Sequence, residues 1–139
     1  MPNSHTHIDF SGQNLSFRNF QGRNFKNRVF KKANLESANF CGADLSFSDL
    51  SECNLSNANF SKAILNGATL ENSTLTHTDF EGAHLLLTNF TSCFIEGADF
   101  SSASHLRSAL FLNCTVYTNT NGLEDLSDVQ KSTITYEIS

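Results

Sequence analysis

Residues 33–45 read ANLESANFCGADL and repeat one pattern almost three times in thirteen positions. Each repeat places a small residue first, then an amide or carboxylate, then a large apolar residue, and then two polar or small residues. A helix repeats every 3.6 residues and a strand every two, so neither alone explains a period of five. The fold therefore depends on which backbone arrangement repeats every five residues.

The large apolar residue, called here the centre of each quintet, recurs at every fifth position from residue 10 to residue 100. The centres are Phe10, Leu15, Phe20, Phe25, Phe30, Leu35, Phe40, Leu45, Leu50, Leu55, Phe60, Leu65, Leu70, Leu75, Phe80, Leu85, Phe90, Ile95 and Phe100. Asn or Asp precedes the centre in 13 of these 19 quintets. Residues two apart in an extended segment point the same way, so the centre and the small residue face inward while Asn or Asp faces outward. The two remaining residues can turn a corner, so each quintet is one short strand and one bend.

Stacking of like centres indicates how many quintets close one coil. When centres four quintets apart are compared, one column contains only Phe (Phe20, Phe40, Phe60, Phe80 and Phe100) and another only Leu or Ile (Leu15, Leu35, Leu55, Leu75 and Ile95). Columns built from every third or every fifth quintet mix Phe with Leu. The sequence therefore predicts a coil of four sides, with successive coils about 4.8 Å apart. A helix is excluded, because centres five apart would scatter over all of its faces.

This motif resembles the pentapeptide-repeat family over residues 8 to about 117. The resemblance implies an all-β, right-handed four-sided parallel β-helix, which we expect to have about 5.5 coils and a short C-terminal capping helix. The predicted organisation is an N-terminal tail (1–7), the solenoid (8–117) and a C-terminal cap helix and tail (118–139). The rhythm slips by one residue after Phe100, which indicates an insertion or bulge within 101–105.

The composition and motifs of the sequence do not indicate an enzyme. The 139 residues suffice for one domain, and 13 Phe argue against disorder. No enzyme motif occurs, so we predict a protein that is not an enzyme and has no cofactor. His5 and His7 have the spacing of metal ligands but lack further partners, so no metal is expected. No export or membrane-spanning segment is recognised, which favours a cytoplasmic protein without membrane contact.

Three of the four cysteines share one inward column of the predicted solenoid. Cys53, Cys93 and Cys114 occupy the small position and are expected to fill space. Cys93 and Cys114 are close enough to pair but are expected to stay reduced in a cytosol.

The two ends of the solenoid depart from the repeat. In the first coil the inward position holds Gln13, Arg18, Arg23 and Arg28, and we expect the arginines to curl over the open end as a polar cap. An anion or nucleic-acid patch is the alternative, since six of the nine basic residues lie between 18 and 32. The polar first coil common in the family favours the cap, and no direct nucleic-acid binding is expected.

At the C-terminal end, Leu123, Leu126 and Val129 would share one face of a helix that starts near Asn121. These residues would cap the last coil or contact a second copy. Residues 132–138 alternate like a strand or a tail, and the sequence does not place them.

Apolar residues also occur where the repeat requires polar ones. Phe47, Ile64, Leu86 and Leu87 fall on or next to one side, with His84 and Arg107 nearby. Several large apolar groups on one wall indicate a contact surface for a partner or a second copy. The alternative is that Phe47 and Leu87 stack along a corner.

Two functions follow from these patterns. The first is a rigid scaffold for protein–protein interaction, which binds a protein partner or forms a homodimer. The second comes from the family resemblance, because some members mimic duplex DNA and bind a type II topoisomerase, DNA gyrase, which can confer quinolone resistance. Residues 33–130 contain 12 acids and only Lys62 and Arg107 as bases. However, the acids lie on all four predicted sides and the first coil is basic, so the scaffold is favoured.

Overall fold

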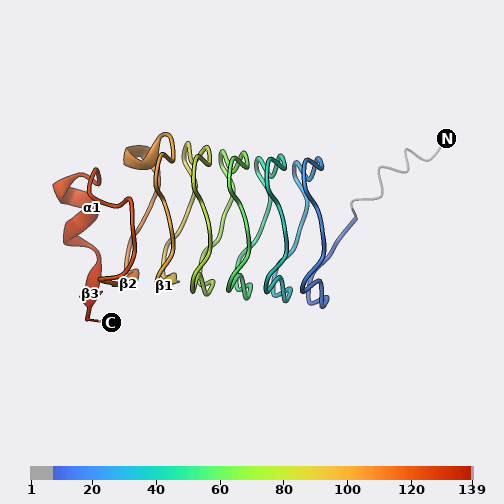
Figure 1. Cartoon of the computed structure of the whole chain (residues 1–139), viewed down its shortest axis with the longest axis horizontal. Coiled ribbons are helices and arrows are strands. Elements are labelled where there is room, and N and C mark those ends of the chain that lie inside the picture. The colour runs from blue at the N-terminus through green and yellow to red at the C-terminus, as the bar shows by residue number, and fades with distance from the viewer. Residues whose placement is uncertain (1–7, 139) are drawn as a thin grey trace.

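The computed structural model describes residues 8–138, and these form a rod of stacked coils in which the first described coil and β3 lie at opposite ends (Figure 1). The named elements all belong to its C-terminal part: β1 (Phe94–Ile95), η1 (Leu106–Ser108), β2 (Thr115–Tyr117), α1 (Asp128–Ser132) and β3 (Thr135–Glu137). Elsewhere the coils pair through single parallel bridges rather than long strands. No helix within the described part of the chain has the length and apolar character needed to cross a membrane.

The bridges confirm a coil of four sides. Asp9 pairs with Val29 in parallel, and every later quintet pairs with the fourth quintet after it as far as His84 and Ser104. One turn of the chain therefore contains four quintets. We name the sides after their first centres, in chain order: the Phe10, Leu15, Phe20 and Phe25 sides.

A left-handed residue turns each corner. Phe17 has a φ of 60° and Asn27 a φ of 56° at equivalent corner positions. The turn closes with a hydrogen bond, as where the Gln13 N–H donates to the Phe10 carbonyl at 3.2 Å. A side chain in this conformation costs about 1–2 kcal/mol. The ladder between coils offsets that cost, since the corner N–H groups also donate to the next coil.

The centres form the core as predicted. Phe40, Phe60 and Phe80 are fully buried and stack face to face, with centroids 5.0 and 5.4 Å apart. The spacing of about 4.8 Å between coils imposes this stacking, because equivalent residues of successive coils lie directly above one another. Ala38 and Ala58 are buried beside them at the small position.

Outward Asn and Asp side chains bond to the backbone and to one another. The Oδ1 of Asn39 accepts the N–H of Cys41 at 3.0 Å, and the Nδ2 of Asn39 donates to the Oδ1 of Asn19 at 3.3 Å. The repeated amide therefore has a local structural use, since it satisfies a turn N–H that the coil ladder does not reach.

The slip in the rhythm occurs at the C-terminal limit of the predicted segment. Ser104 still pairs with His84, which lies 20 residues, or four quintets, before it. Leu110 pairs with Asn89, which lies 21 residues before it, so this coil contains one extra residue. The extra residue is absorbed around His105, which has a φ of 62° and precedes η1.

Parallel pairing continues beyond this insertion to the end of the described chain. β1 pairs with β2, and β2 pairs with β3 in a register that joins Thr115 to Thr135. The segment that the sequence did not place is therefore a further rung on the Leu15 side.

The C-terminal helix begins later than the sequence predicted. Ser127 is the N-cap of α1, because its Oγ accepts the Gln130 N–H while the Gln130 Oε1 accepts the Ser127 N–H. Leu123 and Leu126 precede the helix and are buried, whereas Val129 lies within it and is 76% exposed. The prediction that these three residues share one helical face is therefore wrong.

Candidate protein-interaction surface

Most of the large apolar side chains that the described chain exposes lie at one corner of the rod or beside it, on the adjoining sides and on α1. This corner joins the Phe25 side to the Phe10 side. We define the apolar stripe as Phe47, Ile64, Leu86, Leu87, Leu110, Leu112 and Val129. All of these are exposed except Ile64, which is half-buried. Phe17, which is 74% exposed, lies at the diagonally opposite corner.

The corner itself contributes Phe47, Gly67, Leu87 and Ser108, at equivalent positions in successive coils. The side chains of Phe47 and Leu87 are 67% and 65% exposed. The Phe47 ring leans over Gly67, so that a Cβ built on that glycine would lie 2.6 Å from the ring. The Leu87 N–H donates to the Ser108 Oγ at 3.2 Å, which orders the corner above it. The corner therefore presents an almost continuous apolar edge.

The adjoining wall brings together the other residues that the sequence predicted. Ile64 bridges His84, which is exposed and has its Nδ1 3.3 Å from the Ser104 Oγ. Leu86 is exposed, and its N–H donates to the Asn66 Oδ1 at 3.2 Å. These side chains lie on successive rungs of the Phe25 side.

Sequence reasoning missed two members of the stripe. Leu110 and Leu112 flank the buried centre Phe111 on the Phe10 side, and both are exposed. Together with Val129 of α1 they line a shallow, mainly apolar pocket of about 200 Å³. The sequence did contain a sign of Leu110, because this leucine directly precedes the centre Phe111, where the repeat usually has Asn or Asp. The one-residue insertion before it shifts the numbering of the repeat, so the departure was not noticed.

The stripe is also depleted of charge. The members of the stripe carry no formal charge, and neither do Asn66, Gly67, Asn89 and Ser108 between them. The exposed charges that border it are Arg107, which precedes Ser108, and Asp128, which precedes Val129. By contrast, residues 33–130 contain 12 acids and only two bases. Depletion of charge at a patch of large apolar residues is typical of the centre of a protein interface.

The basic first coil presents arginines and lysines in different settings. Ion pairs join Lys26 to Asp44 at 3.4 Å and both Lys31 and Lys32 to Glu52 at 3.6 and 3.9 Å. Burial alone would raise the pKa of Asp44, but hydrogen bonds from Ser46 and the nearby Lys26 outweigh it and hold that pKa below its usual value.

The arginines of the predicted polar cap have a different environment. Arg18 and Arg23 are exposed and Arg28 is half-buried, and the ion pairs of residues 8–138 do not include them. Phe10 and Phe20 are partly buried at the same end and pack against the core. The role of the arginines as a cap stays a prediction.

The three inward cysteines are buried and bond to the preceding coil. The Sγ of Cys53 donates to the Phe30 carbonyl at 3.0 Å, and the Sγ of Cys114 donates to the Phe90 carbonyl at 2.8 Å. Burial raises the pKa of Cys53 to about 12 and that of Cys114 to about 11. The thiols therefore stay protonated and act as small donors, and Cys93 and Cys114 are free rather than paired.

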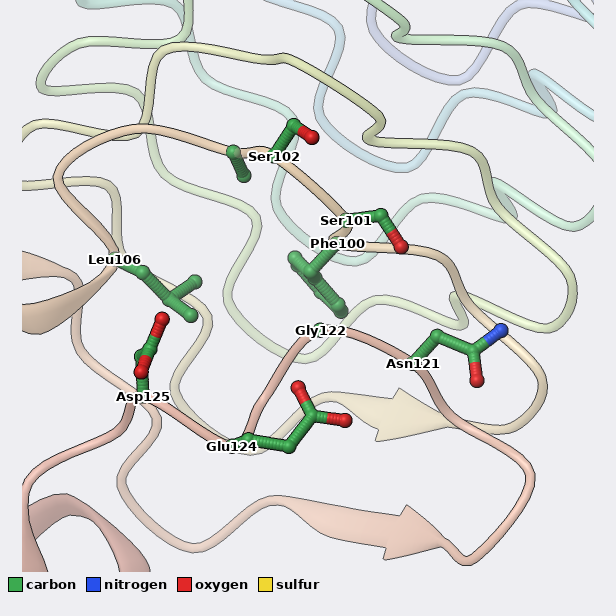
Figure 2. A pocket seen from close by; sticks show the side chains of 9 residues that line it. Phe100, Ser101, Ser102, Leu106, Asn121, Gly122, Glu124 and Asp125 are labelled. Atoms are coloured by element: carbon green, nitrogen blue, oxygen red, sulfur yellow. The ribbon is translucent and has the colours of Figure 1, made fainter.

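A polar pocket of about 400 Å³ lies between the last regular coil and the cap. Figure 2 shows Glu124, Asp125 and Asn121 around it, opposite Ser101 and Ser102. Within residues 8–138 no group of three or more His, Cys, Asp or Glu is placed to hold a metal. The pocket is thus the space left where the cap departs from the repeat, and His5 and His7 lie outside the described residues.

Comparisons with known proteins agree with this geometry. A sequence model described as "Pentapeptide repeat region" matches residues 43–120, and one described as "Pentapeptide repeats (8 copies)" matches residues 8–46 and 19–57. No curated protein sequence matches the chain significantly.

Several solved structures share the architecture. A pentapeptide repeat protein from the thylakoid lumen of Arabidopsis thaliana is 25% identical, with 88% of this chain and 74% of that chain covered and a TM-score of 0.60. HetL, involved in heterocyst differentiation regulation in Nostoc, is 20% identical over 96% and 69% of the two chains, with a TM-score of 0.65. A trypsin-treated form of QnrB1, a plasmid-mediated fluoroquinolone resistance protein, is 22% identical over 94% and 79%, with a TM-score of 0.51.

The predicted fold class is confirmed, since the neighbours are right-handed β-solenoids and the bridges of this chain give coils of four sides. At 20% and 22% identity, HetL and QnrB1 show the shared fold alone. The family models span more than half of the chain, and the stacked quintets supply the physical reason for the match. The chain belongs to the pentapeptide-repeat family.

Proposed function

We propose that this protein is a rigid, non-enzymatic scaffold that acts by binding a protein through its apolar stripe. The observation that carries the proposal is the gathering of six exposed large apolar side chains at and beside one corner of an acidic rod. Exposed apolar patches of this kind mark interaction sites.

The construction of the rod supports a binding role. Stacked aromatic centres and the ladder between coils hold the backbone of the corners in place before any partner arrives. A preorganised surface loses little entropy on binding, which favours affinity. The polar side chains of the walls are engaged with the backbone and with one another, as Asn39 is with the Cys41 N–H and with Asn19, so they offer little for acid–base chemistry.

Affinity capture with three forms of the protein tests the proposal. Leu87→Asp places a charge at the centre of the stripe, while Phe17→Asp makes the same kind of change at the opposite corner. The two positions are matched, since both are exposed corner residues with φ values of 55° and 60°. We expect a protein that the wild type and Phe17→Asp retain and that Leu87→Asp loses. Retention by all three forms, or equal loss from both variants, would exclude the stripe as the binding surface.

A second candidate function is DNA mimicry directed at a type II topoisomerase such as DNA gyrase. The excess of ten acids over bases in residues 33–130 favours it, because an acidic rod could occupy a DNA-binding groove. The basic first coil and the neutral stripe oppose it. The similarity to QnrB1 supports only the shared architecture.

A gyrase supercoiling assay with and without a quinolone separates the two functions. Our proposal predicts no protection and no inhibition at near-stoichiometric protein. Protection of supercoiling from the quinolone at that ratio would make topoisomerase binding the leading function.

We also propose that the protein works in the cytoplasm. Its four cysteines are free thiols, which suits a reducing compartment. One similar structure comes from the thylakoid lumen, so the compartment needs a direct test. Recovery of the protein in a membrane-enclosed, oxidising fraction after cell fractionation would contradict this assignment.

A further inference from the structure

We infer that a second copy of this chain covers the apolar stripe, with the two rods side by side and antiparallel. The inference rests on the proposed function and names the partner for the same surface. It follows from the order of the stripe along the rod, from the distribution of charge and from the area available.

The stripe is arranged almost symmetrically about Leu87. Toward the N-terminal end, the Phe47 ring leans over Gly67 and so occupies the level one coil away from Leu87. Toward the C-terminal end, Leu110 lies one coil beyond Asn89, and Leu112 accepts the Ser92 N–H through its carbonyl at the same level. Large apolar groups thus stand about 5 Å to either side of Leu87 along the rod axis.

A two-fold axis that passes by Leu87 would use this arrangement fully. In such a contact a residue near the axis meets its own counterpart, and every contact away from the axis forms twice, once in each direction. Leu87 would meet Leu87 of the second copy, and Phe47 would meet the cluster of Leu110, Leu112 and Val129. A parallel arrangement would instead place Phe47 against Phe47 and leave the leucine cluster against itself.

Charge limits where two copies can meet. Two rods that each carry an excess of ten acids over residues 33–130 repel one another over most of their walls, and this repulsion is weakest along the stripe, whose members carry no formal charge.

The rod has enough surface for this contact. A standard interface buries roughly 800 Å² on each partner. The accessible surface of the chain is 7216 Å², so such a contact would use about a ninth of it. Part of one wall and its corner suffice, and the remaining walls and both ends stay accessible.

Sedimentation equilibrium over a concentration series gives the first test. We expect a dimer for the wild type and for Phe17→Asp, and a dissociation constant raised roughly 30-fold or more in Leu87→Asp. A wild-type protein that stays monomeric to millimolar concentration would overturn the inference. The affinity capture described above then decides the proposed function. If the wild type is monomeric but captures another protein that Leu87→Asp does not retain, the scaffold function stands without the dimer. If the wild type captures no protein that Leu87→Asp loses, the scaffold function and the dimer are both wrong.

Disulfide cross-linking then tests the direction of the rods. A Cys41→Ala background removes the half-exposed native thiol, while the other three are buried. On mild oxidation, Leu87→Cys alone should form covalent dimers, because that position lies next to the two-fold axis. Phe47→Cys and Leu112→Cys should cross-link efficiently only when the two proteins are mixed, and Phe17→Cys should not cross-link. Efficient dimers from Phe47→Cys alone, or equal cross-linking of Phe17→Cys, would overturn the antiparallel arrangement.

Discussion

The ring of Phe47 lies across the backbone of Gly67 in the next coil, where a Cβ would fall 2.6 Å from the Cδ1 and Cε1 atoms of the ring. Gly67 also has a φ of +67°, so its lack of a side chain meets a steric requirement and a conformational one together. Gly42 has a similar φ of +65° but nothing within 4 Å of its Cβ position. The two glycines therefore separate backbone strain from the contact with Phe47.

Replacement of these glycines by alanine should give two different losses of stability. Gly42→Ala should lower the free energy of unfolding by about 1–2 kcal/mol, because only the left-handed backbone is strained. Gly67→Ala should lower it by up to about 1 kcal/mol more, because the exposed Phe47 ring must also rotate away from the new methyl group. Urea unfolding of both variants measures the difference. Equal midpoints would show that the Phe47 contact carries no energy.

The aromatic column should dominate core stability. Phe60 stacks between Phe40 and Phe80, so Phe60→Ala leaves a cavity and should cost about 3–5 kcal/mol. Phe60→Leu should cost less than half of that, since Leu serves as the centre on other sides. Phe17→Ala is the surface control and should stay within about 0.5 kcal/mol of wild type in thermal or urea unfolding. A similar cost for Phe60→Ala and Phe17→Ala would contradict the stacked core.

The buried thiols should make the protein less stable in alkali. Folded Cys53 has a pKa of about 12 against an ordinary value of 9.0, so it holds its proton to a higher pH than the unfolded chain does. Its contribution to stability is therefore complete below pH 9 and is lost as the pH rises toward 12.

Cys53→Ala should remove that part of the pH dependence, and Ala33 in the same column shows that alanine fits the position. Between pH 9 and 11, the decline in the free energy of unfolding should be shallower than in wild type by up to about 1.4 kcal/mol per pH unit. Urea unfolding at each pH compares the two proteins, in which all other titrating groups are shared. Parallel curves would show that the Cys53 thiol does not differ between the folded and unfolded states.

Gln130 should hold the C-terminal cap on the rod. Its Nε2 donates to the carbonyls of Leu106 and Ala109 at 3.0 and 2.8 Å, and its Oε1 caps α1 at Ser127. Gln130→Ala should therefore speed amide hydrogen exchange in β3 and α1 while the central coils keep their protection. Ser132→Ala, whose hydroxyl bonds only within the helix, is the matched control. Unchanged exchange in the Gln130 variant would mean that Leu123 and Leu126 hold the cap without it.

The regular part of the fold could be predicted because one position in five determines it. Centres such as Phe60 and ladder residues such as Asn39 recur without interruption, so period and parity together specify four sides. The C-terminal part could not be predicted in the same way. The extra residue at His105 is absorbed by η1, and β3 pairs only because the cap returns the chain to the Leu15 side one coil after β2.

The candidate surface was predictable only where the rhythm held. Phe47 and Leu87 stand out because the repeat fixes what their positions should contain. Leu110 follows the insertion, and its place beside Leu87 depends on how that insertion is accommodated in three dimensions. The start of the helix was predicted wrongly. The spacing of the apolar residues indicated a start near Asn121, but the helix begins after Ser127, where Ser127 and Gln130 form a capping box.

Hydroxyl-radical footprinting across a concentration series tests most directly whether the stripe is the binding surface, because it reports side-chain exposure in the unmodified protein. Phe47 and Phe17 react through the same kind of ring and have similar exposure, at 67% and 74%. Our interpretation predicts that labelling of Phe47, Leu87 and Leu112 falls as the complex forms, while labelling of Phe17 stays constant. Equal labelling of Phe47 and Phe17 at every concentration, or protection of Phe17 alone, would contradict it.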